Sequence, residues 1–202
     1  MSSEPIAALD APSPTKTPMW AYGLIGLVLM AFAAAAEHAM GRIWICKCGY
    51  IRFWVGDVSS SENSQQIADW YSFSHIIHGF ILYAVTRWIG RRRGWSVGWC
   101  FVLAVLVEVS WEVLENSPII INRYRQTMSL GYTGDSVLNS MSDILFAVLG
   151  FSLAAKLPAW LTISLIVLME VGVGYAIRDN LTLNIIMLLH PFPAIKRWQM
   201  GM

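Results

Sequence analysis

Residues 134–151 read GDSVLNSMSDILFAVLGF, a polar opening that runs without a break into an apolar stretch. At 100° per residue in a helix, Asp135, Asn139 and Asp143 fall within an arc of about 80°, and Ser142 lies beside them. An aspartate at bilayer depth is costly unless another group compensates its charge. The stretch therefore predicts a membrane helix whose polar stripe faces protein rather than lipid.

The composition supports the same conclusion for the whole chain. Of the 202 residues, 56% are hydrophobic and only 13% are charged, which excludes an ordinary soluble globular protein. About 20 apolar residues in helix cross a bilayer core. Five segments have nearly that length: Met19–Met40, Ser72–Gly90, Trp95–Leu114, Ser136–Ala155 and Leu157–Ile177. We predict an all-α, polytopic membrane helical bundle of about five transmembrane helices.

The two ends of the chain differ from these spans. Residues 1–17 are rich in serine and proline and predict a disordered tail, so residues 18–202 form a single transmembrane helical domain. The first span could be mistaken for a signal peptide, but its length favours a retained helix. The apolar run Leu181–Leu189 is too short to span and predicts an interfacial or re-entrant helix, ended by Pro191 and Pro193.

The only dense basic cluster, Arg91–Arg93, sets the expected topology. Short loops rich in arginine stay in the cytoplasm, so the N-terminus is also predicted to be cytoplasmic. Counting along the spans then places one group of polar residues in the opposite leaflet: Glu37, His75, His78, Glu112, Glu115, Asp135, Asn139, Arg178 and Asp179. The net charge of +1 and the lack of a basic, aromatic-rich patch argue against nucleic-acid binding.

A second acidic stripe lies on the span before the opening stretch. Glu108, Glu112 and Glu115 are spaced i, i+4, i+7 and share an arc of about 60°. His75 and His78, in SHIIHG, share one face of another span. Because bare carboxylates cannot all stay charged in a bilayer, we expect the two acidic stripes to face each other inside the bundle.

Three interpretations of these polar groups stay open. They could simply hold the helices together through ion pairs and hydrogen bonds. They could form a cation or proton relay in a transporter, although five spans without an internal repeat fit this poorly. They could bind a divalent metal such as Zn, Mn or Fe, since imidazole and carboxylate ligands suit these ions. The candidate metal ligands are His75 and His78 with two or three of Glu108, Glu112, Glu115, Asp135 and Asp143, and foremost Glu112, Glu115 and Asp135.

The same region supplies candidate catalytic and binding residues. Glu112 and Asp143 are candidate general bases, with Glu108 beside them. Planar guanidinium groups suit phosphate, so Arg123 and Arg125 could bind the headgroup of a lipid, unless they pair with nearby acids. Further candidate substrate-binding residues are Asn116, Ser136, Asn139 and Arg178.

The segment between the first two spans has two features of its own. Residues 56–75, GDVSSSENSQQIADWYSFSH, could cap the bundle and line its mouth, or form a solvated loop. Cys46 and Cys48 in ICKCG could indicate a metal or redox pair, but a lone C-x-C is a weak signal.

Six motifs together carry a family resemblance: ICKCG, SSENSQQIADWY, SHIIHG, WEVLENSPIIINRYR, GDSVLNSMSD and IRDNLTLN. They resemble an uncharacterised family of alphaproteobacterial membrane proteins of unknown function, over about residues 40 to 198. The resemblance implies a multi-pass protein of the bacterial inner membrane and no particular activity.

The sequence thus predicts an outward-facing polar chamber within a membrane bundle. The preferred function is a membrane-embedded, metal-dependent hydrolase or transferase that acts on an amphiphilic or lipid-linked substrate from the periplasmic face. The alternatives are a structural or assembly protein without catalysis, and a small ion- or proton-coupled transporter.

Overall fold

The computed structural model describes residues 17–127 and 131–201 of the chain. The predicted tail therefore lies outside the described residues, except for its last position. The described residues form eight helices: α1 (Met19–Ala39), α2 (Ser72–Arg93), α3 (Val97–Glu115), α4 (Pro118–Arg125), α5 (Val137–Ala154), α6 (Ala159–Ile177), α7 (Leu181–Leu189) and α8 (Pro193–Gln199). The predicted all-α, polytopic helical bundle is confirmed.

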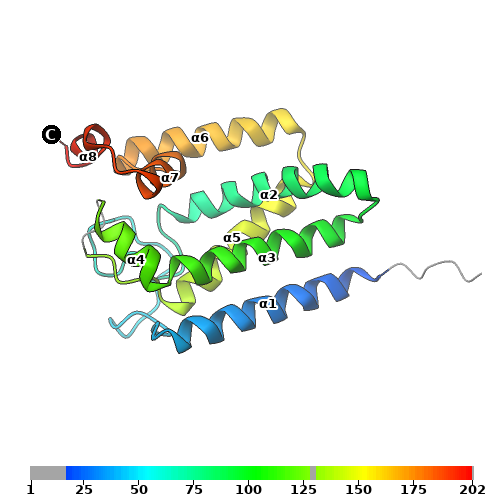
Figure 1. The fold of residues 1–202 in the computed structure, drawn as a ribbon, viewed down its shortest axis with the longest axis horizontal. Coiled ribbons are helices and arrows are strands. Elements are labelled where there is room, and N and C mark those ends of the chain that lie inside the picture. The colour runs from blue at the N-terminus through cyan, green and yellow to red at the C-terminus, as the bar shows by residue number, and fades with distance from the viewer. Residues whose placement is uncertain (1–16, 128–130, 202) are drawn as a thin grey trace, which may run out of the picture.

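Four helices, α1, α3, α5 and α6, are long and apolar enough to cross a membrane. The fifth predicted span, α2, is equally long at 22 residues but less apolar, because histidines lie near its start and Arg91–Arg93 form its last turn. It packs chiefly against α5 and also against α3. Helix α2 therefore packs within the bundle along its first half and exposes Ile81, Val85 and Trp88 along its second, whereas α1 and α6 lie at the outside (Figure 1).

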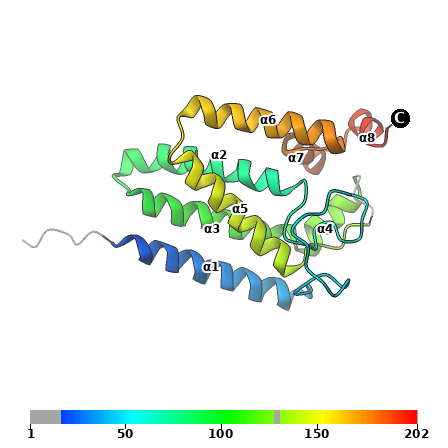
Figure 2. The same cartoon turned by 180° about the vertical axis from the view of Figure 1, so that it is seen from behind.

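The five long helices run roughly along one direction, and the short helices α4, α7 and α8 gather at one end of them (Figures 1 and 2). At this end α1, α3 and α6 finish and α2 and α5 begin. The segment 41–71, which we call the capping loop, lies at the same end. The polar helix ends that the sequence assigns to one leaflet therefore lie together.

The capping loop is tied to the start of α5 by hydrogen bonds. The backbone N–H groups of Ser136 and Val137 donate to the carbonyls of Ser64 and Ile43 over 3.0 and 2.8 Å. The Asn139 side chain donates to the Gln66 carbonyl over 2.9 Å. The polar residues Ser64, Gln65, Gln66 and Asp69 of the capping loop are buried. The loop therefore covers the bundle and is not simply solvated.

Two shorter features refine the sequence-based expectation. Cys46 and Cys48 are joined as a disulfide within the capping loop, which fits the redox alternative rather than the metal one. Pro193 does not merely stop a helix, because it occupies the first turn of α8. Its missing N–H is tolerated there, since the first-turn N–H groups of a helix have no partner inside the helix.

Glycines allow α2 and α5 to approach closely. A Cβ atom on Gly79 would overlap the carbonyl oxygen of Ala147, and one on Gly150 would overlap the carbonyl oxygen of Ile76. Small residues at helix crossings let backbones pack closely inside membranes. This crossing brings the histidines of α2 next to the polar stripe of α5.

We expect Gly79→Ala to destabilise the protein, because the added methyl group would force α2 away from α5. Overpacking of this kind costs about 1 to 3 kcal/mol. Thermal unfolding of the purified protein in detergent should show a lower Tm for Gly79→Ala than for wild type. Gly23→Ala in α1 is the matched control, since a Cβ there meets nothing within 4 Å. Equal Tm values for the two variants would contradict the close crossing.

Candidate functional site

His75 of α2 lies between the acidic stripes of α3 and α5. Its Nδ1 is 2.7 Å from Glu108 Oε1 and 3.3 Å from Glu112 Oε1. On the other side of the ring, Nε2 is 3.8 Å from Asp143 Oδ2. His78 Nδ1 also lies 3.1 Å from Glu108 Oε1. The two stripes therefore face inward, as expected, with an imidazole between them.

We call His75, His78, Glu108, Glu112 and Glu115 the His/Glu cluster. Ligand atoms of His75, His78 and Glu108 all lie within 4.8 Å of one another, and so do those of His75, Glu112 and Glu115. Both groups combine imidazole with carboxylate, a donor set that suits Zn, Mn or Fe. The cluster could therefore hold a metal. Glu108, expected as a catalytic residue or a metal ligand, belongs to it.

Glu112 is the most unusual member of this cluster. It is 0% exposed, and neither carboxylate oxygen makes a hydrogen bond among the described residues, although His75 Nδ1 lies 3.3 Å from Oε1. Burying a polar group without a hydrogen bond costs free energy, and a carboxylate costs more. A bound cation would give both oxygens a ligand bond, whereas His75 approaches only Oε1.

Asp135 was expected among the metal ligands but belongs to neither group of potential ligands. It accepts hydrogen bonds from Asn116 Nδ2 over 3.0 Å and from the Tyr132 hydroxyl over 2.9 Å. Its backbone N–H donates to Asn116 Oδ1 over 2.7 Å. Burial raises the pKa of Asp135 to about 6, and these hydrogen bonds partly offset that increase.

A cavity of about 730 Å³ extends from the His/Glu cluster to the end of the bundle. Its buried wall includes His75, Asp69 and Asp143, whereas Val58 and Ser59 of the capping loop form an exposed rim. Glu115 also lines it, while Glu108 and Glu112 lie outside its lining. The cavity thus connects the exterior with a deep group of ionisable side chains.

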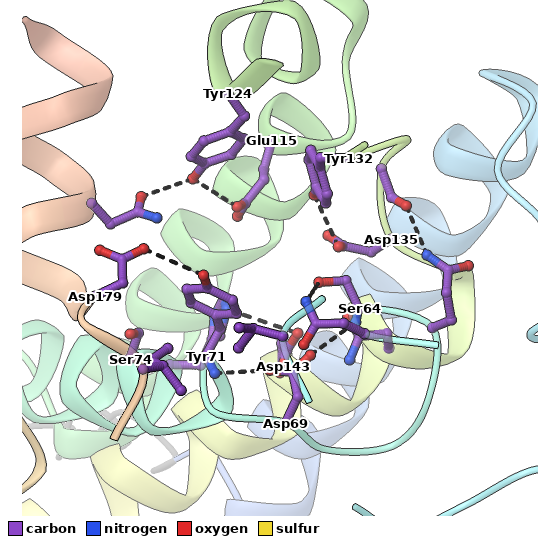
Figure 3. Close-up of a pocket in the computed structure, with 18 of the residues that line it drawn as sticks. Ser64, Asp69, Tyr71, Ser74, Glu115, Tyr124, Tyr132, Asp135, Asp143 and Asp179 are labelled. Atoms are coloured by element: carbon purple, nitrogen blue, oxygen red, sulfur yellow. Dashed lines mark hydrogen bonds and ion pairs between the residues drawn. The ribbon is translucent and has the colours of Figure 1, made fainter. Parts of the chain in front are cut away.

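Three tyrosines direct their hydroxyl groups at carboxylates around this cavity, as Figure 3 shows. Tyr71 donates to Asp179 over 3.3 Å, Tyr124 to Glu115 over 2.9 Å, and Tyr132 to Asp135. Burial raises the pKa of each hydroxyl well above its usual range, so the tyrosines act as neutral donors at pH 7.

Two further carboxyl groups outside the spans line the cavity. Burial raises the pKa of Asp179 to about 6. Hydrogen bonds from the Asn180 N–H and the Tyr71 hydroxyl lower this pKa and so offset part of the increase. Burial also raises the pKa of Asp69, although backbone N–H groups, first that of Ser64, donate to its carboxylate and lower it. Acidic groups from four parts of the chain therefore converge on one space.

The structure divides the predicted substrate-binding residues into two sets. Asn139 and Arg178 line the cavity. The others make contacts within the fold and do not line it: Asn116, Ser136, Arg123 and Arg125. Asn116 holds Asp135, and Ser136 accepts from the Asn139 N–H at the start of α5.

The two arginines proposed to bind phosphate are also engaged elsewhere. Arg123 donates to the carbonyls of Leu188 and Leu189 over 2.6 and 2.9 Å, which ties α4 to the end of α7. Arg125 donates to the Tyr132 carbonyl over 2.6 Å. Their guanidinium groups therefore serve as links between segments at this end of the bundle.

Sequence analysis missed Tyr124 and Tyr132 as cavity residues. Tyr124 stands between two arginines in RYR, and Tyr132 follows a glycine in GYTGD, so neither belongs to a periodic pattern. A signal was nevertheless present, because Tyr132 lies three residues before Asp135 in a polar loop. Only the folded chain shows which carboxylate each hydroxyl meets.

The sequence matches over residues 37–201 a family described as a protein of unknown function, DUF2585. Curated relatives called UPF0314 proteins include one from Rhizobium meliloti (strain 1021), 45% identical over 92% of this chain and 93% of the relative. Another, from Sphingopyxis alaskensis, is 53% identical over 88% and 94%. The chain belongs to this family. The predicted resemblance to an uncharacterised alphaproteobacterial family is thereby confirmed.

A third relative in the family, from Novosphingobium aromaticivorans, is 55% identical over 80% of this chain and 84% of its own length. The family match covers the capping loop, the His/Glu cluster and all three tyrosines. No solved structure matches the chain. The chemistry of this family must therefore be argued from the site itself.

We expect the stability of the protein to decrease as the pH rises from about 4 to about 6. A carboxyl group whose pKa is raised by folding stabilises the folded state below its unfolded pKa, and this contribution is lost as the pH rises through the folded pKa. For Asp135 the shift from 3.8 to about 6 corresponds to about 3 kcal/mol. Measurements of Tm against pH should therefore show a flatter profile for Asp135→Asn than for wild type.

Asp57→Asn is the control for this measurement, because Asp57 is exposed on the capping loop and does not line the cavity. It should keep the wild-type pH profile. Parallel profiles for wild type and Asp135→Asn would show that this carboxyl group does not titrate as its burial implies.

Proposed function

We propose that this protein is a membrane-embedded, metal-dependent hydrolase or transferase. Its substrate would be an amphiphilic or lipid-linked molecule whose polar part enters the cavity from the periplasmic face of the bacterial inner membrane. This orientation follows from placing Arg91–Arg93, at the opposite end of α2, in the cytoplasm.

One observation carries the proposal. The carboxylate of buried Glu112 makes no hydrogen bond among the described residues, and the histidine 3.3 Å from its Oε1 also approaches Glu108 and Asp143. Simple helix association would favour saturated hydrogen bonds, because an unsatisfied polar group inside a protein is destabilising. A buried carboxylate that makes no hydrogen bond and shares one histidine with two other acids favours a cation-binding site over mere helix association.

The residues around the cluster would have separate chemical roles. A bound divalent metal would supply a Lewis acid and lower the pKa of a bound water molecule. Asp143 lines the cavity and lies 3.8 Å from His75 Nε2, so it is placed to accept a proton from a nucleophile. The tyrosine hydroxyls would orient polar groups of the substrate, since they already donate to carboxylates at the cavity wall.

The alternatives make different demands on the same residues. A purely structural role would need Glu112 only for packing, so the nearly isosteric Glu112→Gln should then leave any cellular function intact. A transporter would need a path through the bundle, whereas the cavity opens at the end where the capping loop lies. Flux driven by an ion gradient in proteoliposomes would identify transport.

We expect protein purified without chelators to contain about one equivalent or more of Zn, Mn or Fe. His75→Ala removes the residue common to both groups of potential ligands and should reduce bound metal to below about 0.1 equivalent. Glu112→Gln keeps nearly the same shape and should also lose metal while the helical circular dichroism spectrum is retained. Elemental analysis by mass spectrometry measures each content.

His190→Ala provides the matched control, because His190 packs edge to face against Phe192 and is outside both groups of ligands. It should keep the wild-type metal content. Substoichiometric metal in wild type, or unchanged metal in folded Glu112→Gln, would disprove metal binding at the cluster.

A further inference from the structure

The cavity has one apolar side, formed by α7 and the end of α6. Leu181, Ile185 and Leu188 of α7 line it together with Ile177 of α6. The three α7 residues are spaced i, i+4, i+7, so they form one face of this short helix. Ile185 is also 47% exposed, which makes the apolar side of the cavity continuous with the outer surface of the bundle.

Helix α7 is fixed in this position by polar contacts at both ends. The Glu170 carboxylate accepts from the N–H groups of Leu181 and Thr182, each over 3.1 Å. At the other end, Arg123 holds the carbonyls of Leu188 and Leu189. The Tyr124 hydroxyl also lies 3.1 Å from Asn184 Oδ1. Hydrogen bonds therefore hold the apolar side of the cavity in a defined position.

The polar part of the cavity lining, which reaches the start of α7 at Asp179, is acidic (Figure 3). Asp69, Asp135 and Asp179 belong to it and lie outside the His/Glu cluster. Arg178 is the only lysine or arginine among the described residues of the lining, and its side chain is exposed. With pKa values of about 6, Asp135 and Asp179 are mostly ionised at pH 7.5. The charge of this part therefore favours a cation over an anion.

Aromatic side chains complete the acidic part. The rings of Tyr124 and Tyr132 meet edge to face with centroids 5.3 Å apart, and Tyr71 lies across the cavity from them (Figure 3). Aromatic faces next to carboxylates are a chemical setting that attracts organic ammonium groups. Phosphate would instead need several lysine or arginine donors, and Arg123 and Arg125 are engaged with backbone carbonyls.

We propose that the cavity binds an amphiphile with an ammonium headgroup. The headgroup lies between Asp135, Asp179 and the tyrosines, and the hydrocarbon chain passes along α7 at Ile185 into the bilayer. This proposal names the substrate class of the proposed function and rests on that function only in treating the cavity as the substrate site. It does not require the metal.

The test compares three probes by thermal unfolding in an uncharged detergent with a metal chelator present. Dodecyltrimethylammonium has both the ammonium group and the hydrocarbon chain. Dodecyl phosphate has the chain with the opposite charge, and tetramethylammonium has the ammonium group without the chain. Saturating dodecyltrimethylammonium, at about 100 times its Kd, should raise Tm by roughly 5 to 10 °C. The other two probes should give much smaller shifts. An equal shift with dodecyl phosphate would contradict the ammonium site, and an equal shift with tetramethylammonium would contradict the chain path.

Two pairs of variants locate the binding site. Asp179→Asn removes a cavity charge and should abolish most of the shift, whereas Asp57→Asn makes the same change outside the cavity and should retain it. Ile185→Trp fills the chain path and should also abolish the shift. Ile163→Trp, at a position 61% exposed on α6, should retain it. Equal shifts within either pair would overturn the assigned position.

The chelator separates this proposal from the metal-dependent function. If protein purified without chelators contains no metal and dodecyltrimethylammonium still raises Tm, only the metal-dependent function is contradicted. Stoichiometric metal without a preference for dodecyltrimethylammonium would contradict only the substrate class.

Discussion

The fold buries carboxylates between apolar helices, so it depends on other groups that compensate their charge. His75 does this most directly, because its two ring nitrogens approach Glu108 and Glu112 on one side and Asp143 on the other. Without such partners these acids would add several kcal/mol to the cost of membrane insertion. The close α2–α5 crossing at Gly79 and Gly150 brings the imidazole to this position. The packing of α2 against α5 therefore also assembles the polar site.

The polar end of the bundle is built in layers around that interaction. The capping loop closes over the start of α5 through backbone contacts at Ser136 and Val137. Helices α4 and α7 are joined by Arg123, so the outer wall is held without a large apolar core. This arrangement leaves a cavity whose lining combines acidic and aromatic side chains with an aliphatic face of α7. Such a combination matches the two parts of an amphiphile and suits a protein that works at a membrane surface.

Charge distinguishes the site from a phosphate-binding pocket. Expectations based on residue type gave Arg123 and Arg125 that role, yet both donate to backbone carbonyls. The carboxylates instead dominate the lining, and burial keeps the pKa of Asp135 and Asp179 near 6, close enough to neutrality to respond to a cation. A metal at the His/Glu cluster and an ammonium group near the mouth would each offset part of this negative charge.

The sequence by itself determined the helical membrane fold, because apolar runs of bilayer length and charge stripes at helical spacing are local properties of the chain. The i, i+4, i+7 spacing of Glu108, Glu112 and Glu115 fixed that they share a face. Tertiary structure decided what that face meets: Glu115 accepts a hydrogen bond from Tyr124, which no periodic pattern indicates. It also directed the Arg123 side chain of α4 to the carbonyls at the end of α7 rather than into the cavity. Long-range hydrogen bonds depend on how helices pack, and packing is a property of the whole chain.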